Sequence, residues 1–218
     1  EVLAILRTAK SPVAIVGGAG WDSATNAAFG HFARHWGIPV AGAFRRQDAI
    51  GNDRREWAGN LGYGPNPKLV QRIKRADVLL VVGARLGEAT TDGYTLITPD
   101  HPGQTLIHVH PDRNELNRVY RADIAIAADP GSFAIEIVIA DFPDKPAADA
   151  ADAHAEWLDW STPKPREGVT LDLGMCVAAM RERLDSFNTI ICNGAGNFSG
   201  WWHRYWHYDG FGTQLAPT

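Results

Sequence analysis

The chain has 218 residues, enough for more than one average domain, and 45% of them are hydrophobic and 21% charged, as in ordinary globular proteins. The formal net charge is -4, and no basic stripe indicates a nucleic-acid partner. No apolar run approaches the roughly 20 residues of a membrane span, and the first residues do not resemble a secretory leader. We therefore expect a cytoplasmic protein that binds neither nucleic acid nor a membrane.

Strand and helix patterns alternate through the first two thirds of the chain. Residues 13–18 form an apolar, β-branched run that ends in glycine, which is typical of a buried parallel strand. Asp22 and Ser23 are good N-caps for a helical pattern that runs to about His35. Further strands are predicted at 38–41, 77–83, 105–110 and 124–127, and further helices at 66–75, after Pro111-Asp112, and from Asp129 to about Ile139.

Strands that alternate with helices of this length pair in parallel through right-handed crossovers. Residues 1–142 are therefore predicted to form an α/β domain, a doubly wound, mostly parallel Rossmann-like sheet with helices on both faces.

The composition changes in the last third of the chain. Residues 143–169 are rich in proline, alanine and aspartate, and we expect an exposed linker with one short helix around Trp157. Residues 170–218 contain a helical pattern at 170–184, a strand at 189–192 and then a glycine-rich turn. Because no later strand is expected to complete a sheet, we expect an incomplete second α/β domain and a chain that is part of a longer protein.

The two cysteines, Cys176 and Cys192, lie in a helical pattern and a strand pattern. Without further ligand-type residues at a suitable spacing, they favour neither a disulfide nor a metal site. We expect both thiols to be buried in a reducing compartment.

Two glycine-rich turns follow predicted strands, where backbone N–H groups can approach a phosphate. The first, at residues 17–20, lacks an acidic ribose ligand, because Phe44-Arg45-Arg46 stands at the end of the second strand. We therefore favour a purely structural role for its glycines. The second turn, at residues 194–197, is the sharper candidate for an anion site, because Asn197 and Ser199 can add side-chain hydrogen bonds.

Arg85 directly follows the strand at 77–83, at the sheet edge where open α/β folds bind ligands. Its guanidinium can contact a phosphate or form a surface salt bridge, and the sequence leaves both alternatives open.

Four histidines are candidate metal ligands. His108 and His110 alternate along one strand and share a face, but no carboxylate stands beside them at a ligand spacing, which favours hydrogen-bonding roles. His203 and His207 are four residues apart and are expected to be neighbours on a helix. The aromatic residues around them, at 201–208, favour a subunit interface over a metal site.

A family resemblance is carried by four segments, at residues 12–18, 37–40, 76–86 and 106–112. Taken in order, they resemble the middle domain of thiamine-diphosphate enzymes of the acetolactate synthase type. Residues 194–201 resemble the first turn of that family's cofactor-binding domain, so that the resemblance covers most of the chain outside the linker.

The resemblance implies a transferase or lyase that uses thiamine diphosphate and Mg²⁺ to act on a 2-oxo acid or related carbonyl compound, by carboligation or decarboxylation, with the cofactor as electron sink. It also implies a small-molecule substrate and a homodimer or homotetramer. By position, the residues that contact the cofactor's diphosphate are Gly194, Ala195, Gly196, Asn197 and Phe198. Acetolactate synthases carry glutamine and histidine in place of Asn197 and Phe198, which argues against acetolactate synthesis itself.

The middle domain of the family binds FAD, ADP or no nucleotide. The family's FAD contacts include an arginine that matches Arg85, but residues 87–90 replace the acidic and arginine residues that follow it. We therefore favour an empty middle domain over FAD or ADP. The family's catalytic glutamate and its Mg²⁺-binding Gly-Asp-Gly…Asn motif have no counterpart in these 218 residues, so we assign no catalytic or metal-binding residue and expect the chain alone to be inactive.

Two alternative functions remain. One is a free-standing nucleotide-binding protein such as an NAD-dependent deacetylase, but two cysteines cannot supply the four-cysteine zinc site that is common in that class. The other is a non-catalytic structural or oligomerisation module.

Overall fold

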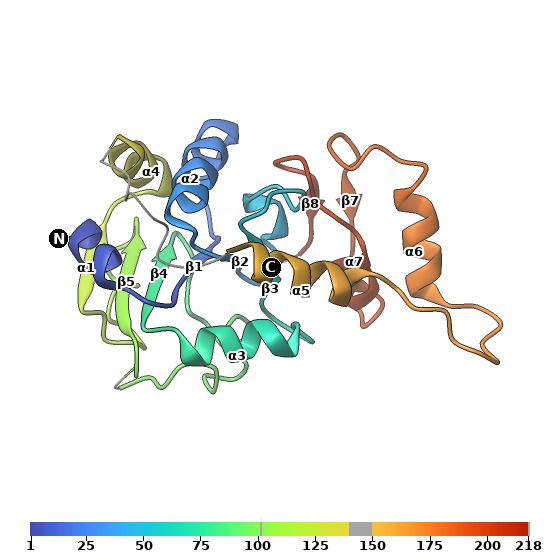
Figure 1. Ribbon diagram of the computed structural model, residues 1–218, viewed down its shortest axis with the longest axis horizontal. Coiled ribbons are helices and arrows are strands. Elements are labelled where there is room, and N and C mark those ends of the chain that lie inside the picture. Colours follow the sequence, from blue (N-terminus) through green and yellow to red (C-terminus); the bar gives the residue numbers. More distant parts are fainter. Residues whose placement is uncertain (101, 140–149, 218) are drawn as a thin grey trace.

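The computed structural model describes residues 1–100, 102–139 and 150–217. The first part of the chain forms α1 (Val2–Thr8), β1 (Pro12–Val16), α2 (Ser23–Trp36), β2 (Val40–Gly42), the 3-10 helix η1 (Gln47–Ala49), β3 (Trp57–Asn60), α3 (Pro67–Arg75), β4 (Val78–Val82), β5 (Thr105–His110), β6 (Ile124–Ala127) and α4 (Pro130–Val138). The second part, which we call the C-terminal segment (residues 150–217), forms α5 (Ala150–Ser161), α6 (Leu173–Arg181), β7 (Ile191–Cys192), α7 (Ser199–Tyr205) and β8 (Gln214–Leu215). Helix α6 lies at the opposite end of the molecule from α1 and β5 (Figure 1).

The first part is built on a six-stranded sheet in the order β3-β2-β1-β4-β5-β6. Every neighbouring pair of strands is parallel. The chain winds outward from β1 to β3 and then returns to β4 on the other side of β1, so that the strand order reverses between β1 and β4. The predicted doubly wound Rossmann-like fold is therefore confirmed.

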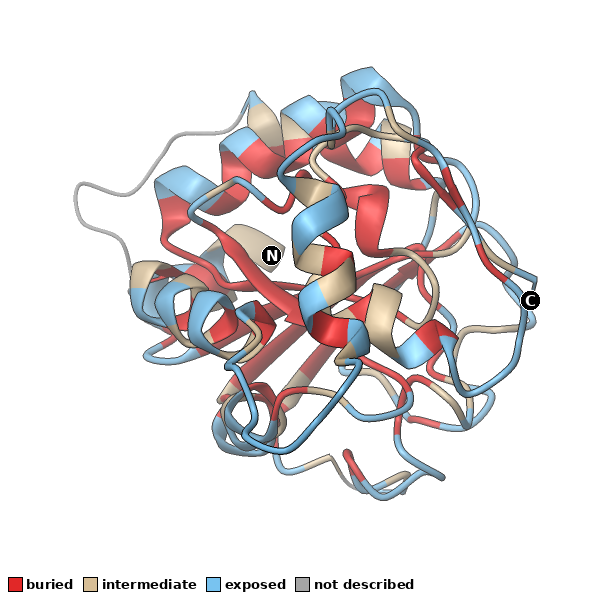
Figure 2. Ribbon diagram, turned by 90° about the vertical axis from the view of Figure 1, so that its right-hand side faces the viewer, coloured by how far each residue is buried: buried red, intermediate tan, exposed pale blue. Residues whose placement is uncertain are grey.

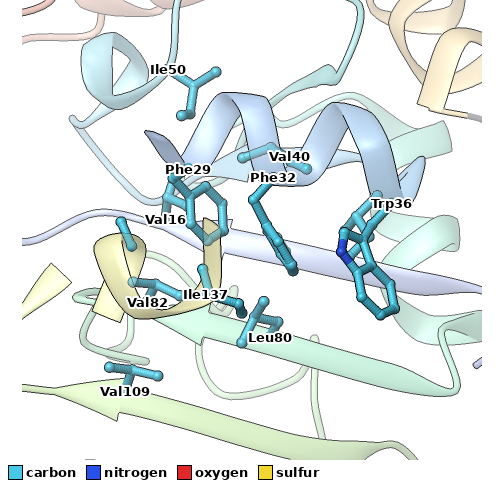
Figure 3. Packing of buried hydrophobic residues seen from close by; sticks show 14 of the residues in the cluster. Val16, Phe29, Phe32, Trp36, Val40, Ile50, Leu80, Val82, Val109 and Ile137 are labelled. Carbon is cyan, nitrogen blue, oxygen red and sulfur yellow. The ribbon is translucent and has the colours of Figure 1, made fainter. Parts of the chain in front are cut away.

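Side chains of the two central strands alternate between two hydrophobic layers. Val16, Leu80 and Val82 pack with Phe32 and other residues of α2 and α4 on one face, as Figure 3 shows. On the other face, Val13, Ile15, Leu79 and Val81 pack with Leu69 and Ile73 of α3. A strand buried on both faces reads as a continuous apolar run, which explains why β1 and β4 were recognisable in the sequence. Figure 2 shows these buried strands between helices with exposed outer surfaces.

Polar side chains cap three of the helices, and Asp22 was predicted as one of these caps. Asp22 accepts a hydrogen bond from the Thr25 backbone N–H at 2.7 Å and caps α2, which ends at Gly37 in the left-handed conformation. Asn66 caps α3, and Asp129 caps α4 in the same way.

The helix predicted after Pro111-Asp112 is wrong. Residues 113–117 form turns, in which the Asn114 N–H donates to the Asp112 carboxylate at 2.9 Å. Asn117 has a φ of 61°, which cannot be continued as a right-handed helix. Local hydrogen bonds to the aspartate and asparagine side chains therefore stabilise turns here in place of the helix that the Pro-Asp pattern predicts.

Three elements of the first part of the chain were not predicted: α1, η1 and β3. Strand β3 has the sequence Trp-Ala-Gly-Asn, and glycine and asparagine are both depleted in strands. It is a strand because β2 pairs with it, and because α5 covers it. Trp157 of α5 is buried and meets Trp57 of β3 edge to face, with ring centroids 6.2 Å apart. The predicted helix around Trp157 is thus confirmed, whereas the predicted domain boundary after residue 142 lies outside the described residues.

The C-terminal segment contains more regular structure than expected. Strand β8 pairs in parallel with β7, so the expectation that no strand follows residue 192 is wrong. Helix α6 is shorter than the predicted 170–184. Both cysteines were expected to be buried, but Cys176 is half-buried and Cys192 is exposed, because β7 turns only one face toward the interior. Among the described residues, no helix is both long and apolar enough to span a membrane.

Candidate functional site

The first glycine-rich turn lies at the centre of the sheet's carboxyl edge, where the strand order reverses. Gly18 has a φ of 72°, and a Cβ atom there would lie 1.9 Å from the Gly83 carbonyl oxygen. The Trp21 indole N–H donates to the Gly17 carbonyl at 2.8 Å, and its ring is buried. Close packing of backbone against backbone thus accounts for Gly18 and Gly83 without any ligand, and a Cβ atom at Gly17 would lie 2.6 Å from the Ala43 Cβ.

Arg85 follows β4 at the same edge. Its side chain is exposed, and its Nε atom lies 3.2 Å from the Glu115 carboxylate, which also pairs with Arg118. Glu115 belongs to the connection after β5. Arg85 is therefore directed to the β5 side of the sheet, and its proposed contact with a nucleotide stays a prediction.

The end of β2 carries two arginines in place of an acidic ribose ligand. Arg45 has a φ of 59°, and its guanidinium lies over the Phe44 ring, 4.5 Å from the centroid. An Arg46 nitrogen lies 4.0 Å from the Asp48 carboxylate. Asp48 is buried, and this burial raises the pKa of its carboxyl group.

The two histidines of β5 share a face, as predicted, with ring centroids 6.0 Å apart. His108 is buried, and its Nε2–H donates to the Ala84 carbonyl at 3.0 Å. Burial lowers the pKa of His108. His110 Nδ1 accepts a hydrogen bond from the Asp112 N–H at 3.1 Å. Both rings therefore have hydrogen-bonding roles.

The second glycine-rich turn connects β7 to α7, and we call residues 194–198 the candidate turn. All of its residues are exposed. The Phe198 ring folds back over the turn, so that a Cβ atom at Gly196 would lie 2.6 Å from a carbon of this ring. A side chain at position 196 would therefore have to displace this exposed ring.

The backbone of the candidate turn is available to a ligand. Helix α7 begins with hydrogen bonds from the Ser199 and Gly200 N–H groups to the carbonyls of Gly196 and Asn197. In the described part of the chain, none of the N–H groups of residues 194–198 donates a hydrogen bond to the protein. Consecutive exposed N–H groups can bind the oxygen atoms of an anion. Ser199 is buried at the start of α7, and its side-chain contribution to an anion site stays a prediction.

Two residues next to the candidate turn were missed in the sequence. Asn193, the first residue after β7, is buried and donates to the Gly194 carbonyl at 3.1 Å. Its amide nitrogen lies 3.5 Å from Nε2 of His203, which is also buried. Burial, together with the positive charge of Arg45, lowers the pKa of His203 to about 4, so its ring is neutral at pH 7. Asn193 could have been noticed in the sequence, because it is a polar residue directly after an apolar strand.

His203 and His207 are not neighbours on a helix, because α7 ends at Tyr205. His207 lies instead against α5, where its Nε2 is 3.2 Å from the Ser161 hydroxyl and its ring centroid is 4.4 Å from that of Trp157. Burial lowers the pKa of His207 to about 3, helped by the charge of Arg181.

The aromatic residues of the 201–208 region pack largely within the chain itself. Trp206 and Tyr208 are buried in a cluster with Val177 and Ile191. The Arg204 guanidinium stacks 3.6 Å from the Trp160 ring centroid. The aromatic density therefore reflects the local core, and an interface role stays a prediction for the rest of the segment.

The structure thus keeps the five residues of the candidate turn together but does not bring Arg85 to them. The turn adjoins the β2 side of the sheet, where the Phe44 and His203 rings meet with centroids 6.5 Å apart. Arg85 faces the opposite side, toward Glu115.

Comparison with known proteins gives a consistent assignment. Residues 1–137 match the family described as thiamine pyrophosphate enzyme, central domain. The chain is 29% identical to a sulfoacetaldehyde acetyltransferase of Alcaligenes xylosoxydans xylosoxydans over 139 residues, which are 61% of this chain and 22% of the relative. It is 24% identical to an acetolactate synthase of Mycobacterium avium over 156 residues, which are 72% of this chain and 24% of the relative. The matched region therefore spans about a quarter of the length of these relatives.

Proposed function

The chain belongs to the thiamine pyrophosphate enzyme family, whose central domain it contains, and from this premise we propose that it is part of a thiamine-diphosphate- and Mg²⁺-dependent enzyme. The substrate of this enzyme is a 2-oxo acid or a related carbonyl compound, and the reaction is carboligation or decarboxylation. The observation that carries the proposal beyond the family is the candidate turn, with its exposed and unused backbone N–H groups.

The residues of the candidate turn fit one end of the cofactor. A diphosphate needs hydrogen-bond donors that do not carry bulky side chains, and Gly194 and Gly196 leave the backbone accessible. Asn197 is exposed and adds an amide that can donate to a phosphate oxygen. Thiamine diphosphate, when bound, supplies the electron sink for bond cleavage or formation next to a carbonyl.

The buried neighbours of the turn hold it in shape. Asn193 fixes the first carbonyl of the turn, and the neutral ring of His203 accepts from the Asn193 amide. A histidine that stays neutral at pH 7 adds no positive charge that would compete with Mg²⁺ near a diphosphate. In this proposal these two residues organise the turn and do not react.

The names of the relatives support a transferase, since they are an acetyltransferase and acetolactate synthases. Asn197 and Phe198 argue against acetolactate as the product. We therefore propose an enzyme that transfers a two-carbon or acyl unit. A lyase is the alternative.

The central domain itself is proposed to hold no nucleotide. Its glycine-rich turn is filled by the packing of Trp21, and Arg85 is paired with Glu115. Purified protein of this kind would show no flavin absorbance and no nucleotide in its mass spectrum, whereas bound FAD or ADP would overturn this part of the proposal. We further propose a cytoplasmic homodimer or homotetramer.

The function is tested with the complete protein that contains this chain, after thiamine diphosphate and Mg²⁺ have been removed by dialysis against a chelator. Pyruvate consumption should be restored only when both are added back. The 218-residue chain alone should show no activity. Consumption of pyruvate without the cofactor, or by the short chain, would contradict the proposal.

The two alternative functions are less well supported. The family match covers the Rossmann-like domain itself, which leaves no independent observation for a deacetylase. A purely structural module remains the outcome if the complete protein shows no cofactor-dependent turnover.

A further inference from the structure

A set of buried polar residues joins the C-terminal segment to the Rossmann-like domain. We call it the interdomain network; its members are Gln47, Asp48, Asn52, Tyr208 and Gln214. All five are buried, with relative exposures between 0% and 5%. Their hydrogen bonds link parts of the chain that are more than 150 residues apart in sequence. Buried polar groups of this kind are satisfied only when the two parts are docked in one arrangement.

Two glutamines form the centre of the interdomain network. The Gln47 backbone N–H donates to Oε1 of Gln214 at 2.8 Å, and Nε2 of Gln214 donates to Oε1 of Gln47 at 2.9 Å. The Gln47 amide also donates to the His203 carbonyl at 2.8 Å. Gln47 therefore holds α7 and β8 at the same time.

The remaining members of the network form further hydrogen bonds between the domain and the C-terminal segment. Asn52 exchanges two hydrogen bonds with Tyr208, donating from its backbone at 3.1 Å and accepting from the Tyr208 N–H at 2.9 Å. The Gln214 N–H donates to the Asp48 carboxylate at 3.2 Å.

The elements held by Gln47 flank the candidate turn on both sides. Helix α7 directly follows the turn, and His203 lies within this helix. Strand β8 pairs with β7, which directly precedes the turn, and the Leu215 carbonyl accepts from the Asn193 N–H at 3.0 Å. Gln47 thus bonds to the helix that follows the turn and to the strand that pairs with β7 before it.

We propose that Gln47 is a positioning residue for the candidate turn: by holding α7 and β8 together, it sets the geometry of the backbone that receives the diphosphate. This inference rests on the proposed function for the identity of the ligand. It assigns to the Rossmann-like domain a part in cofactor binding that needs no contact between that domain and the cofactor.

The first experiment measures the positioning itself, on the 218-residue chain and without any cofactor. In Gln47→Met, amide hydrogen exchange at residues 191–215 should become about tenfold faster, because two buried side-chain hydrogen bonds are lost. Exchange in β1 and β4 should not change. Gln71→Met, at an exposed glutamine of α3, is the matched control and should behave as the wild type.

A second variant separates positioning from general loss of folding. Gln214→Met breaks the same pair from the other side, and the double variant Gln47→Met/Gln214→Met should exchange only slightly faster than either single variant. Effects that multiply in the double variant, or an acceleration that reaches β1 and β4, would overturn the proposal.

The second experiment uses the complete enzyme. Gln47→Met should raise the concentration of thiamine diphosphate needed for half-maximal activity about tenfold, while kcat at saturating cofactor changes less than threefold. An unchanged cofactor requirement in this variant would overturn the proposal. If the wild type itself shows no cofactor dependence, the proposed function fails, and the exchange experiment still decides whether Gln47 holds the turn.

Discussion

The Rossmann-like domain (residues 1–138) and the C-terminal segment use their hydrophobic side chains very differently. In the domain, β1 and β4 are buried along their whole length between two layers of side chains. In the C-terminal segment, the cluster around Trp206 has only four buried members. Most of the large hydrophobic side chains that are exposed in the described residues lie between residues 169 and 215.

The difference shows what each region needs in order to be stable. A sheet covered by helices on both faces buries enough apolar surface to fold on its own account. A two-stranded sheet is marginal in water, and β7 and β8 have only two residues each. The C-terminal segment therefore depends on its contacts with the domain, through α5 on β3 and through the interdomain network. The comparison predicts that damage to the domain is global, whereas damage to the segment is local.

The largest effect is expected from a pair of glycines in the domain that share a left-handed conformation. Gly18 and Gly64 have φ values of 72° and 69°, but a Cβ atom at Gly18 would overlap the Gly83 carbonyl, and one at Gly64 meets nothing within 4 Å. Gly18→Ala should lower the free energy of unfolding by about 3 kcal/mol or more, because strain and overlap add. Gly64→Ala should cost only about 1–2 kcal/mol.

Urea denaturation of the two glycine variants measures this difference. Helicity and tryptophan fluorescence should be lost together in Gly18→Ala, because the C-terminal segment cannot persist without the domain. Equal midpoints for the two variants would show that the close approach at Gly18 is relieved by a shift of the backbone.

A smaller effect is expected in the C-terminal segment when the pH is lowered. The pKa of His207 is about 3 in the folded chain, below the value of about 6.5 in an unfolded chain. The unfolded chain thus takes up this proton first, so the contribution of His207 to stability is complete above pH 6.5 and is lost as the pH falls toward 3. Burial raises the pKa values of Asp48 and Asp209, which opposes this loss.

The variant His207→Gln isolates the histidine from the opposing carboxylates. Relative to this variant, the wild type should lose about 1.6 kcal/mol between pH 6.5 and pH 5, at up to about 1.4 kcal/mol per pH unit. Fluorescence of the tryptophans in the segment follows the transition. Parallel pH profiles for the two proteins would mean that His207 is protonated in the folded state.

The domain could be predicted from the sequence because its signals are local. The apolar runs of β1 and β4 and the caps Asp22 and Asp129 are each contained within a few residues, and the structure confirms them. Strand β3 was missed because it is a strand through its partners β2 and α5, which lie elsewhere in the sequence.

The candidate site was only partly visible for the same reason. The glycines of the candidate turn stand out in the sequence, and so does the strand before them. Gln47 and Gln214, 167 residues apart, are unremarkable until the fold brings them together. His207 was misplaced because a spacing of four residues predicts helical neighbours only where the helix continues, and α7 ends before it.

The smallest effects are expected at two capping aspartates, one in each region, and they test the comparison most directly. Asp22 caps α2 through Thr25, and Asp172 caps α6 through the Gly174 N–H at 2.8 Å. Because α2 covers the central sheet, Asp22→Ala should lower the thermal midpoint of the whole chain by about 2–4 °C. Helix α6 contributes little to the shared core, so Asp172→Ala should leave this midpoint unchanged and only speed hydrogen exchange at the start of α6. Equal shifts of the midpoint in both variants would show that the segment and the domain unfold as one cooperative unit.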